Sequence, residues 1–399
     1  MTVHGGRNDD PSDASDATPS GIGAEGPGLD EAAVAQSGVT RSGAVRVEET
    51  PLDDEVGHHG WGTGGALSKL PEQPAGPCRQ NRYGLVPLPK TGVTESKSPT
   101  PPWESPLDLL VVGHTNLDHL LHVSELPAQD RTTPIARRET RLGGTGANIA
   151  RAAAHWGVRT GLISRVGADF PNEFREILAA EGIDLRGFET VPAIPSSACF
   201  IAEDGRGGQS TLIDQGPMRD GVPFRVPLTL LGEAPWVHLT TGAPEYLTQV
   251  KAEVRRRGGR IAVDPAQEIH YRWSGEALED LLEGAELFFG NSHEMDRATE
   301  LLGRRSWTDL VDLVPLVIRT NGKHGVAAAS RVGLVEVPGE KPRGLATVTG
   351  AGDAFRGGFY AGWIEGEPLV DTLRAGVRSA RAWIETGGLP KRRSSRRRR

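Results

Sequence analysis

Residues 107–113 read LDLLVVG, and this stretch decides the fold class. A short apolar run that ends in a glycine is typical of a strand buried inside a parallel sheet. Downstream of it, segments of strand and helix character alternate. The predicted strands are 161–166, 236–239, 260–263, 285–290 and 316–320, and the predicted helices are 147–155, 172–181, 246–257, 277–282, 294–302, 354–363 and 369–383. Repeated strand–helix units predict an α/β fold with a mostly parallel sheet covered by helices on both faces.

Two further short strands are predicted at 198–202 and 210–213, on either side of the turn Glu203-Asp204-Gly205. Such a turn between apolar runs indicates a β-hairpin. In open α/β sheets, ligands bind beyond the carboxyl ends of the strands. Several Gly, Asp and Asn residues of this chain fall at those ends, so we expect the functional site there.

Upstream of the deciding stretch, residues 1–105 are rich in Gly, Pro, Ser, Asp and Glu. They show neither strand nor helix periodicity, and such a segment cannot bury enough apolar surface to offset its chain entropy. We therefore expect a disordered N-terminal extension. The folded domain is predicted to be residues 106–388, which is long enough to enclose a sizeable core.

The chain ends in KRRSSRRRR, with seven basic residues in nine, and residues 389–399 are predicted to be a basic tail. A run of like charges is usually solvated. The whole chain carries a formal net charge of −7, which gives no general attraction to nucleic acid or membranes. We therefore expect a solvated tail, and contact of this tail with nucleic acid or an acidic membrane is the alternative.

Cys78 and Cys199 are the two cysteines of the chain, too few for a disulfide framework, so reduced thiols are expected. The N-terminal MTVHGGRNDDPSD has no apolar core of a secretory signal. The apolar runs are too short to span a bilayer. Together these features predict a cytoplasmic protein without membrane contact.

The strongest local motif is VTGAGDAFRGGF at residues 348–359. The small residues Gly350, Ala351 and Gly352 let the backbone approach a ligand, and N–H groups that open a helix form an anion site. A carboxylate beside an anion site, Asp353, is explained if it takes the proton of a hydroxyl that attacks a phosphate. The alternative is an ordinary helix-capping aspartate after a glycine turn.

A second glycine-rich motif, LGGTGAN, occupies residues 142–148. It matches neither the dinucleotide fingerprint nor the P-loop. Gly143 and Gly144 suit a turn, and the amide of Asn148 could bind vicinal hydroxyls. Asn116 and Asp118, just after the first strand, could grip a polyol or could form a turn.

Two smaller motifs each allow two interpretations. Asn291 and Glu294 follow a predicted strand, where Glu294 could hold Mg²⁺ through water or could complete a helix-capping pattern. After the next strand, Thr320, Gly322 and Gly325 could admit an adenine ring or could make a tight turn between strands.

These motifs, in this order, resemble the ribokinase-like, or PfkB, carbohydrate and nucleoside kinases. LGGTGANIARAAAHWG is similar to the first signature of that family and VTGAGDAFRGGF to the second, and the resemblance covers about residues 107–388. It implies a Rossmann-like three-layer ribokinase fold with a small β-sheet lid, here from about 116–141 and 197–214. The chain is more similar to the archaeal-type nucleoside and sugar kinases than to ribokinase itself.

The resemblance also implies residue roles. Asp353 would be the catalytic base, and the amides of Gly350, Ala351 and Gly352 the anion hole. Asn116, Asp118, Gly143, Gly144 and Asn148 would bind the sugar. Asn291 and Glu294 would lie near phosphate and Mg²⁺, and Thr320, Gly322 and Gly325 near the nucleotide, with ATP and Mg²⁺ as the expected cofactors.

Two positions depart from the family pattern. The second signature normally has an aspartate two residues before Thr349, where this chain has Thr347. The change removes a carboxylate near the monovalent-cation site of many members, so dependence on such a cation is in doubt. Thr145 stands where true ribokinases tend to have lysine.

The expected function is therefore an ATP- and Mg²⁺-dependent kinase that phosphorylates a hydroxymethyl group of a sugar or nucleoside. One alternative is a sugar-phosphate kinase of the phosphofructokinase type, in which lid cations would hold the extra phosphate: Arg131, Arg137, Arg138 and Arg141 are the candidates. Another is a catalytically inactive sugar or nucleotide sensor. An open edge of the lid could pair between subunits in a homodimer.

Overall fold

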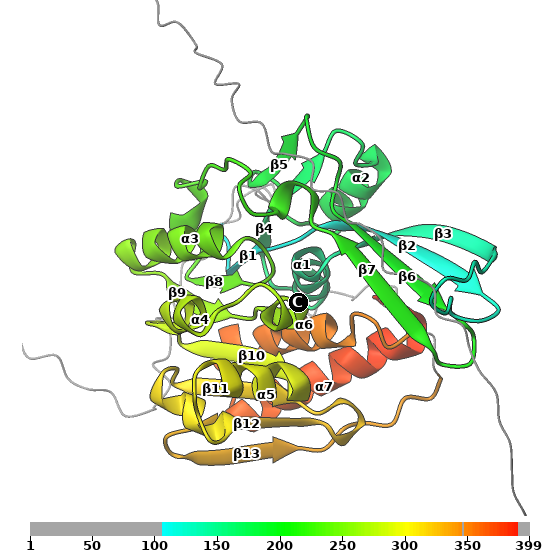
Figure 1. The fold of residues 1–399 in the computed structure, drawn as a ribbon. Helices are drawn as coiled ribbons and strands as arrows, with labels where there is room; N and C mark the ends of the chain where they lie inside the picture. The colour runs from blue at the N-terminus through cyan, green and yellow to red at the C-terminus, as the bar shows by residue number, and fades with distance from the viewer. Residues whose placement is uncertain (1–105, 345–346, 390–399) are drawn as a thin grey trace, which may run out of the picture. The chain divides into compact units, whose positions relative to one another are not determined.

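A nine-stranded sheet organises the computed structural model, which describes residues 106–344 and 347–389 (Figure 1). The predicted N-terminal extension and nearly all of the predicted basic tail lie outside the described residues. The strand order is β13-β12-β11-β10-β9-β8-β1-β4-β5. Its strands are β1 (Leu109–Val112), β4 (Thr160–Gly167), β5 (Phe188–Val191), β8 (Trp236–Leu239), β9 (Arg260–Val263), β10 (Leu287–Asn291), β11 (Leu316–Thr320), β12 (Val326–Ser330) and β13 (Gly333–Val337).

Helices cover both faces of this sheet, which gives the three predicted layers. The helices are α1 (Thr145–His155), α2 (Asn172–Ala180), α3 (Pro244–Arg256), α4 (Gly275–Leu282), α5 (Ser292–Leu301), α6 (Ala351–Ile364) and α7 (Leu369–Thr386). Leu109 and Val111 of β1 pack in one core cluster with α1, α2, α6 and α7. Leu110 and Val112 pack in the other with α3, α4 and α5. A strand that is buried on both sides needs a continuous apolar sequence, which is what LDLLVVG supplies.

The sheet is parallel from β11 to β5, as predicted, but β12 and β13 add an antiparallel edge. The sequence analysis did not identify these two strands, nor β5. A tight turn causes the reversal, because Asn321 N donates a hydrogen bond of 2.8 Å to Gly325 O and leaves no room for a crossover helix.

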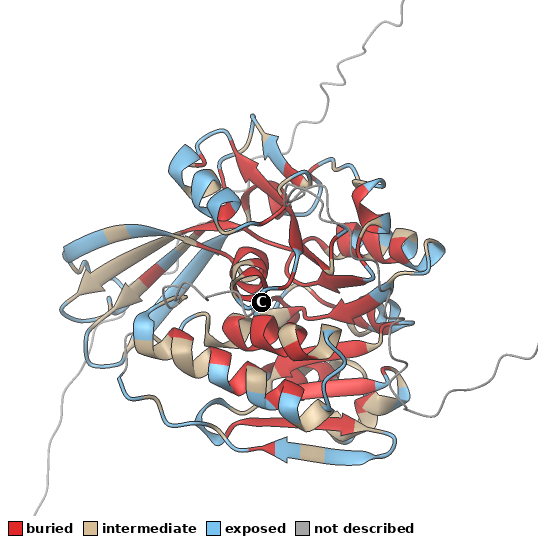
Figure 2. Ribbon diagram, turned by 180° about the vertical axis from the view of Figure 1, so that it is seen from behind, coloured by how far each residue is buried: buried red, intermediate tan, exposed pale blue. Residues whose placement is uncertain are grey.

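A second sheet of four strands, in the order β3-β2-β6-β7, stands beside the first (Figure 1). It consists of β2 (Asn116–Val123), β3 (Ile135–Gly143), β6 (Ala198–Glu203) and β7 (Gln209–Asp214). The predicted hairpin is confirmed, since β6 and β7 pair antiparallel. Figure 2 shows that this sheet is far more exposed than the central strands, and β7 is exposed along its whole length.

The second sheet is tied to the first by very short connections. Three residues separate β1 from β2, and Gly144 alone separates β3 from α1. Asn116 and Asp118 lie on β2, so the interpretation of this pair as a turn was wrong.

Among the described residues, no helix is long and apolar enough to cross a membrane.

Candidate active site

Asp353 and Asn148 meet at the start of two adjacent helices. The Nδ2 atom of Asn148 on α1 donates a hydrogen bond of 3.0 Å to Oδ2 of Asp353 on α6. The two helices can approach this closely because Gly357 faces Ala152, where an added Cβ would lie 2.4 Å from the alanine side chain. Two motifs that are far apart in the sequence therefore share one site, with a carboxylate and an amide at its centre.

Asp118 brings a second carboxylate to the same site from β2. Its side chain lies directly over Gly143 of β3, where an added Cβ would be 2.0 Å from Oδ2. Gly144, which follows, has a φ of 97° and lies against the backbone of residues 114–116. The two adjacent glycines are therefore required by close backbone and side-chain contacts, and the sugar-binding residues predicted from the sequence are brought together.

Both carboxyl groups have raised pKa values. Burial raises the pKa of Asp353 to about 7, although Arg356 and the hydrogen bond from Asn148 lower it. Burial, with repulsion from Asp353, raises the pKa of Asp118 to about 7, while Arg141 lowers it. A pair of interacting carboxyl groups that titrate near neutrality is a common feature of acid–base sites.

The turn before α6 has the geometry of an anion site. Gly350 adopts a left-handed conformation with a φ of 82°, and an added Cβ would lie 2.8 Å from the ring of Trp383. Ala351 N donates to Val348 O, and Ala354 N donates to Gly350 O. Of the three predicted anion-hole amides, that of Ala351 is thus already used, whereas the N–H groups of Gly350 and Gly352, and also that of Asp353, have no backbone acceptor among the described residues. They remain available to an anion.

Glu294 caps a helix, as one of its two interpretations predicted, but the capping leaves one of its carboxylate oxygens available to the site. Asn291 N donates to Glu294 Oε2 at 2.7 Å, and Glu294 N donates to Asn291 Oδ1 at 3.0 Å, which forms a capping box. Burial raises the pKa of Glu294, and Asp264 adds to this effect. The other carboxylate oxygen, Oε1, accepts no hydrogen bond from the described residues.

The described residues contain no group of three or more His, Cys, Asp or Glu side chains that could hold a metal ion. Mg²⁺ beside a nucleotide usually takes one or two carboxylates, with water and phosphate oxygens as its other ligands. A single buried carboxylate with a free oxygen, as in Glu294, fits that kind of site.

Thr320, Gly322 and Gly325 lie around the turn from β11 to β12. Gly325 has a φ of 100°, and an added Cβ would lie 2.1 Å from Val337 O, so packing against β13 alone requires a glycine. Around Gly322, by contrast, an added Cβ would meet open space.

Thr347, at the position of the missing carboxylate, accepts a hydrogen bond of 3.2 Å from Thr349 N through its hydroxyl, and so helps to shape the turn before α6.

The sequence analysis missed a buried ion pair directly behind the turn. Arg356 donates to both carboxylate oxygens of Asp264, at 2.5 and 3.0 Å, and to Gly352 O at 3.0 Å. Asp264 is fully buried, with His238 Nε2 at 3.6 Å on its other side. The ion pair joins the start of α6 to the end of β9. Its sequence signal was present, because Asp264 directly follows a predicted strand and Arg356 lies within the second signature.

A pH profile tests the raised carboxyl pKa. A carboxylate base is active when ionised, so kcat/KM is expected to fall about tenfold for each unit of pH below about 7. An unshifted carboxyl group would place this limb near pH 4. The measurement is the initial rate from pH 4.5 to 9 with limiting acceptor, and a kcat/KM that stays constant down to about pH 5 would contradict the assignment.

Comparisons of this chain with known proteins give consistent results. The model of the pfkB family of carbohydrate kinases matches residues 107–391. A nucleoside kinase of Methanothermobacter thermautotrophicus is 33% identical over 264 residues, which is 66% of this chain and 84% of that protein. An ATP-dependent ribose-1-phosphate kinase of Halopiger xanaduensis is 30% identical over 257 residues, 64% of this chain and 84% of that protein. The crystal structure of the nucleoside kinase of Methanocaldococcus jannaschii, an archaeal member of the ribokinase family, superposes with a TM-score of 0.64 at 26% identity and covers 71% of this chain and 94% of that one.

Proposed function

Because the chain belongs to the pfkB family of carbohydrate kinases and is a phosphotransferase with an alcohol group as acceptor, we propose that it transfers the γ-phosphate of ATP to a hydroxymethyl group of a sugar or nucleoside. Asp353 is the general base. The observation that supports this assignment is the hydrogen bond of 3.0 Å between Asn148 and Asp353, next to the free amides that open α6. It supports the proposal because a base, an amide for sugar hydroxyls and an anion site would then lie within reach of one small molecule.

In this mechanism the acceptor hydroxyl lies between Asp353 and the γ-phosphate. Asp353 takes its proton as the oxygen attacks phosphorus. The N–H groups of Gly350 and Gly352, together with that of Asp353, stabilise the charge that develops on the phosphoryl oxygens, commonly the largest catalytic contribution. Asn116, Asp118, Gly143, Gly144 and Asn148 hold the sugar hydroxyls.

The nucleotide side of the site is assigned to Asn291, Thr320, Gly322 and Gly325. Glu294 would hold Mg²⁺, directly or through water, by its free oxygen. When bound, the ion neutralises charge on the phosphates. The second sheet excludes water from the cleft and so limits wasteful hydrolysis of ATP.

A sugar-phosphate acceptor is a second candidate, and one observation favours it. Arg141 pairs with Asp118 across the strands β2 and β3, so the two side chains lie on the same face of the sheet. The Arg141 side chain is 48% exposed, although its guanidinium already forms an ion pair with Glu139. It could reach a phosphate on the acceptor, as in the relative whose name gives ribose 1-phosphate as substrate.

A phosphorylation screen tests the proposed function. Purified protein with ATP and Mg²⁺ is offered nucleosides, ribose, fructose, fructose phosphates and ribose 1-phosphate, and phosphorylated product is detected by mass spectrometry. We expect product with at least one neutral sugar or nucleoside, and its loss when a chelator removes Mg²⁺. Product with sugar phosphates alone would favour the second candidate. Binding without any product would favour the inactive sensor.

A further inference from the structure

A cavity of about 230 Å³ lies between strand β4, residues 217–224 and the start of α3. Its wall contains none of the residues assigned to the kinase site. Met218 and Tyr246 of this wall pack in the core cluster of α3, α4 and α5. Asn148 and Asp353, by contrast, lie on α1 and α6, which pack against the opposite face of the sheet. The cavity and the proposed catalytic residues are therefore on different faces of the nine-stranded sheet.

Arg165 brings a buried positive charge to this cavity. It follows Ile163 by two positions on β4, so its side chain points to the same face of the sheet, where Ile163 packs in the core. An apolar residue is expected at such a position, because a charge is costly to bury without partners. Arg165 is nevertheless buried, and its carboxylate partner, Glu189 at 2.9 Å, has a side chain that is 45% exposed. This buried cation requires an explanation beyond packing.

The guanidinium of Arg165 also has N–H groups to spare. A guanidinium has five, and three are used, by Glu189, by Pro217 O at 3.0 Å and by Pro223 O at 2.6 Å. Each terminal nitrogen therefore keeps one N–H without an acceptor among the described residues. Because Arg165 lines the cavity, an acceptor placed there can take these hydrogen bonds.

Tyr246 adds a hydroxyl group without a partner. The residue is 3% exposed, and its hydroxyl makes no hydrogen bond with another described residue. The oxygen is not among the fully enclosed polar atoms of the core, so it opens onto the cavity that the residue lines. Burial raises the pKa of Tyr246, with Arg165 opposing the effect, so the hydroxyl keeps its proton and can donate. The N–H groups of Glu245 and Tyr246, in the first turn of α3, also have no backbone acceptor among the described residues.

Apolar side chains form another part of the wall and limit the size of a ligand. Met218, Val222 and Phe224 line the cavity, and the ring of Phe224 meets that of Tyr246 edge-on at 4.7 Å. A cavity of about 150 Å³ holds one benzene ring, so on this scale the present cavity holds roughly nine or ten non-hydrogen atoms. This is the size of an aromatic ring that carries one small polar group.

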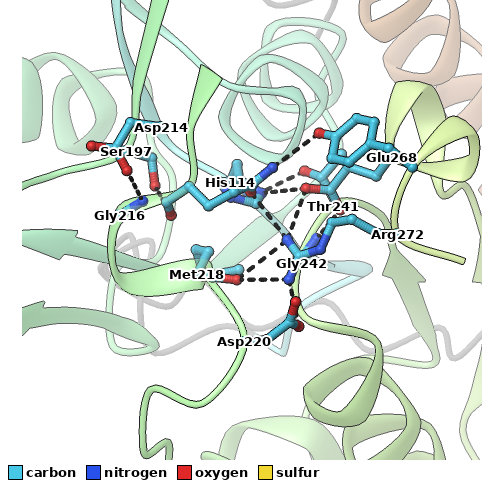
Figure 3. Close-up of polar contacts among 12 residues, drawn as sticks. His114, Ser197, Asp214, Gly216, Met218, Asp220, Thr241, Gly242, Glu268 and Arg272 are labelled. Carbon is cyan, nitrogen blue, oxygen red and sulfur yellow. Dashed lines mark hydrogen bonds and ion pairs between the residues drawn. The ribbon is translucent and has the colours of Figure 1, made fainter. Parts of the chain in front are cut away.

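The mouth of the cavity is acidic, in contrast to its inner end. Asp220 and Glu245 line it and are exposed, whereas the donors of Arg165 and Tyr246 are buried. Asp220 is already paired with Arg272 at 2.7 Å (Figure 3). The carboxylates at the mouth repel a phosphate dianion about twice as strongly as a monoanion. The donors and charges together favour a ligand with a single negative charge and an apolar body.

We propose that this cavity is a second small-molecule site, separate from the kinase site, which binds a small aromatic carboxylate. The carboxylate group accepts hydrogen bonds from Arg165 and from the Tyr246 hydroxyl, beside the positive end of α3. The ring packs against Met218, Val222 and Phe224. The inference goes beyond the proposed function and does not depend on it, because binding at this site requires neither ATP nor an acceptor.

Nuclear magnetic resonance of the methionine methyl groups tests this site, because the chain has only three methionines. Met218 lines the cavity, whereas Met295 is buried next to Glu294, on the nucleotide side of the kinase site. When the full chain, labelled with ¹³C-methyl methionine, is titrated with benzoate, the Met218 signal is expected to shift. The expected dissociation constant is about 0.1–10 mM, as for a ligand of this size. A larger shift at Met295 than at Met218, or no saturable shift at Met218 in this range, would overturn the site.

Two variants test the residues assigned to the carboxylate. Tyr246→Phe keeps the ring and removes the donor, and it is expected to weaken benzoate binding about tenfold. Arg165→Lys keeps a positive charge but loses the planar set of donors, and a loss of at least about tenfold is expected. Tyr360→Phe is the matched control, because it removes the hydroxyl of a buried tyrosine that bonds to His238 at 2.7 Å on the other face of the sheet. Its dissociation constant for benzoate is expected to stay within about twofold of that of the unmodified protein.

The class of ligand is tested with two relatives of the probe. Benzamide and benzylamine keep the aromatic ring but carry no negative charge, and each is expected to bind at least about tenfold more weakly than benzoate. Equal binding of the three compounds would overturn the assignment of a carboxylate. Equal losses of benzoate binding in Tyr246→Phe and Tyr360→Phe would overturn the assignment of the hydroxyl and, with it, the placement of the ligand in this cavity.

Discussion

Replacing Asp353 with asparagine is expected to lower kcat by about 10²–10⁴ and to leave the fold intact. The amide is nearly isosteric with the carboxylate, and its oxygen can still accept the hydrogen bond that Asn148 now gives to Oδ2. The variant therefore keeps the geometry of the site but cannot take a proton from the acceptor. The measurement is the steady-state rate with saturating ATP and acceptor, together with a thermal unfolding curve.

The matched control for this variant is Asp371→Asn. Asp371 occupies the first turn of α7, as Asp353 occupies the first turn of α6, but it pairs with Arg374 at the surface. A helix-capping role alone would give the two variants similar small losses of stability and no loss of rate. Near-normal turnover in Asp353→Asn would show that another group accepts the proton.

Replacing Arg356 with methionine is expected to destabilise the protein by about 3–5 kcal/mol, since it leaves the carboxylate of Asp264 buried without its partner. Asp264 is 0% exposed and accepts two hydrogen bonds from Arg356, so little water can compensate. The substitution also removes the cation that lowers the pKa of Asp353. The acid limb of the rate profile should therefore move to higher pH. Urea unfolding and the pH dependence of kcat/KM measure the two effects.

The double variant Arg356→Met/Asp264→Leu separates folding from catalysis. Replacing both members of a buried ion pair by apolar side chains is often neutral for stability. We therefore expect the double variant to regain much of the stability that the single variant loses, but not the activity, because the contact of Arg356 with Gly352 O is still absent. Recovery of both stability and activity would mean that the ion pair has no role in positioning the turn.

The sequence alone was sufficient to predict those elements whose pattern depends only on neighbouring residues. LDLLVVG must be buried on both sides, and it is, because its alternate residues pack into two different cores. Asp353 and Asn148 stood out because the turns around them need glycines, and the structure shows why: Gly143 lies against Asp118 and Gly350 against Trp383. The second sheet was expected from the family resemblance rather than from its own pattern, and only β6 and β7 were predicted as strands.

The residues that were missed depend on contacts between distant segments. Asp264 and Arg356 are 92 positions apart, and Arg165 and Pro217 are 52 apart, so no local spacing relates them. Glu294 was offered as either a capping residue or a metal ligand. The capping box uses one carboxylate oxygen and leaves the other free, so the two interpretations were never exclusive. The edge strands β12 and β13 were not identified, although the tight turn that precedes them, between β11 and β12, was one of the two interpretations offered for residues 320–325.

The short connections of the second sheet have a mechanical consequence. Asn116 begins β2 and Gly143 ends β3, and the chain passes from Gly143 through one residue into the helix that carries Asn148. A rocking movement of the second sheet would therefore turn about the residues assigned to the sugar and would carry Asp118 toward or away from Asp353. Binding of the sugar hydroxyls and closure of the second sheet over the site would then be coupled. An alcohol too small to contact both Asp118 and Asp353 would leave the second sheet open.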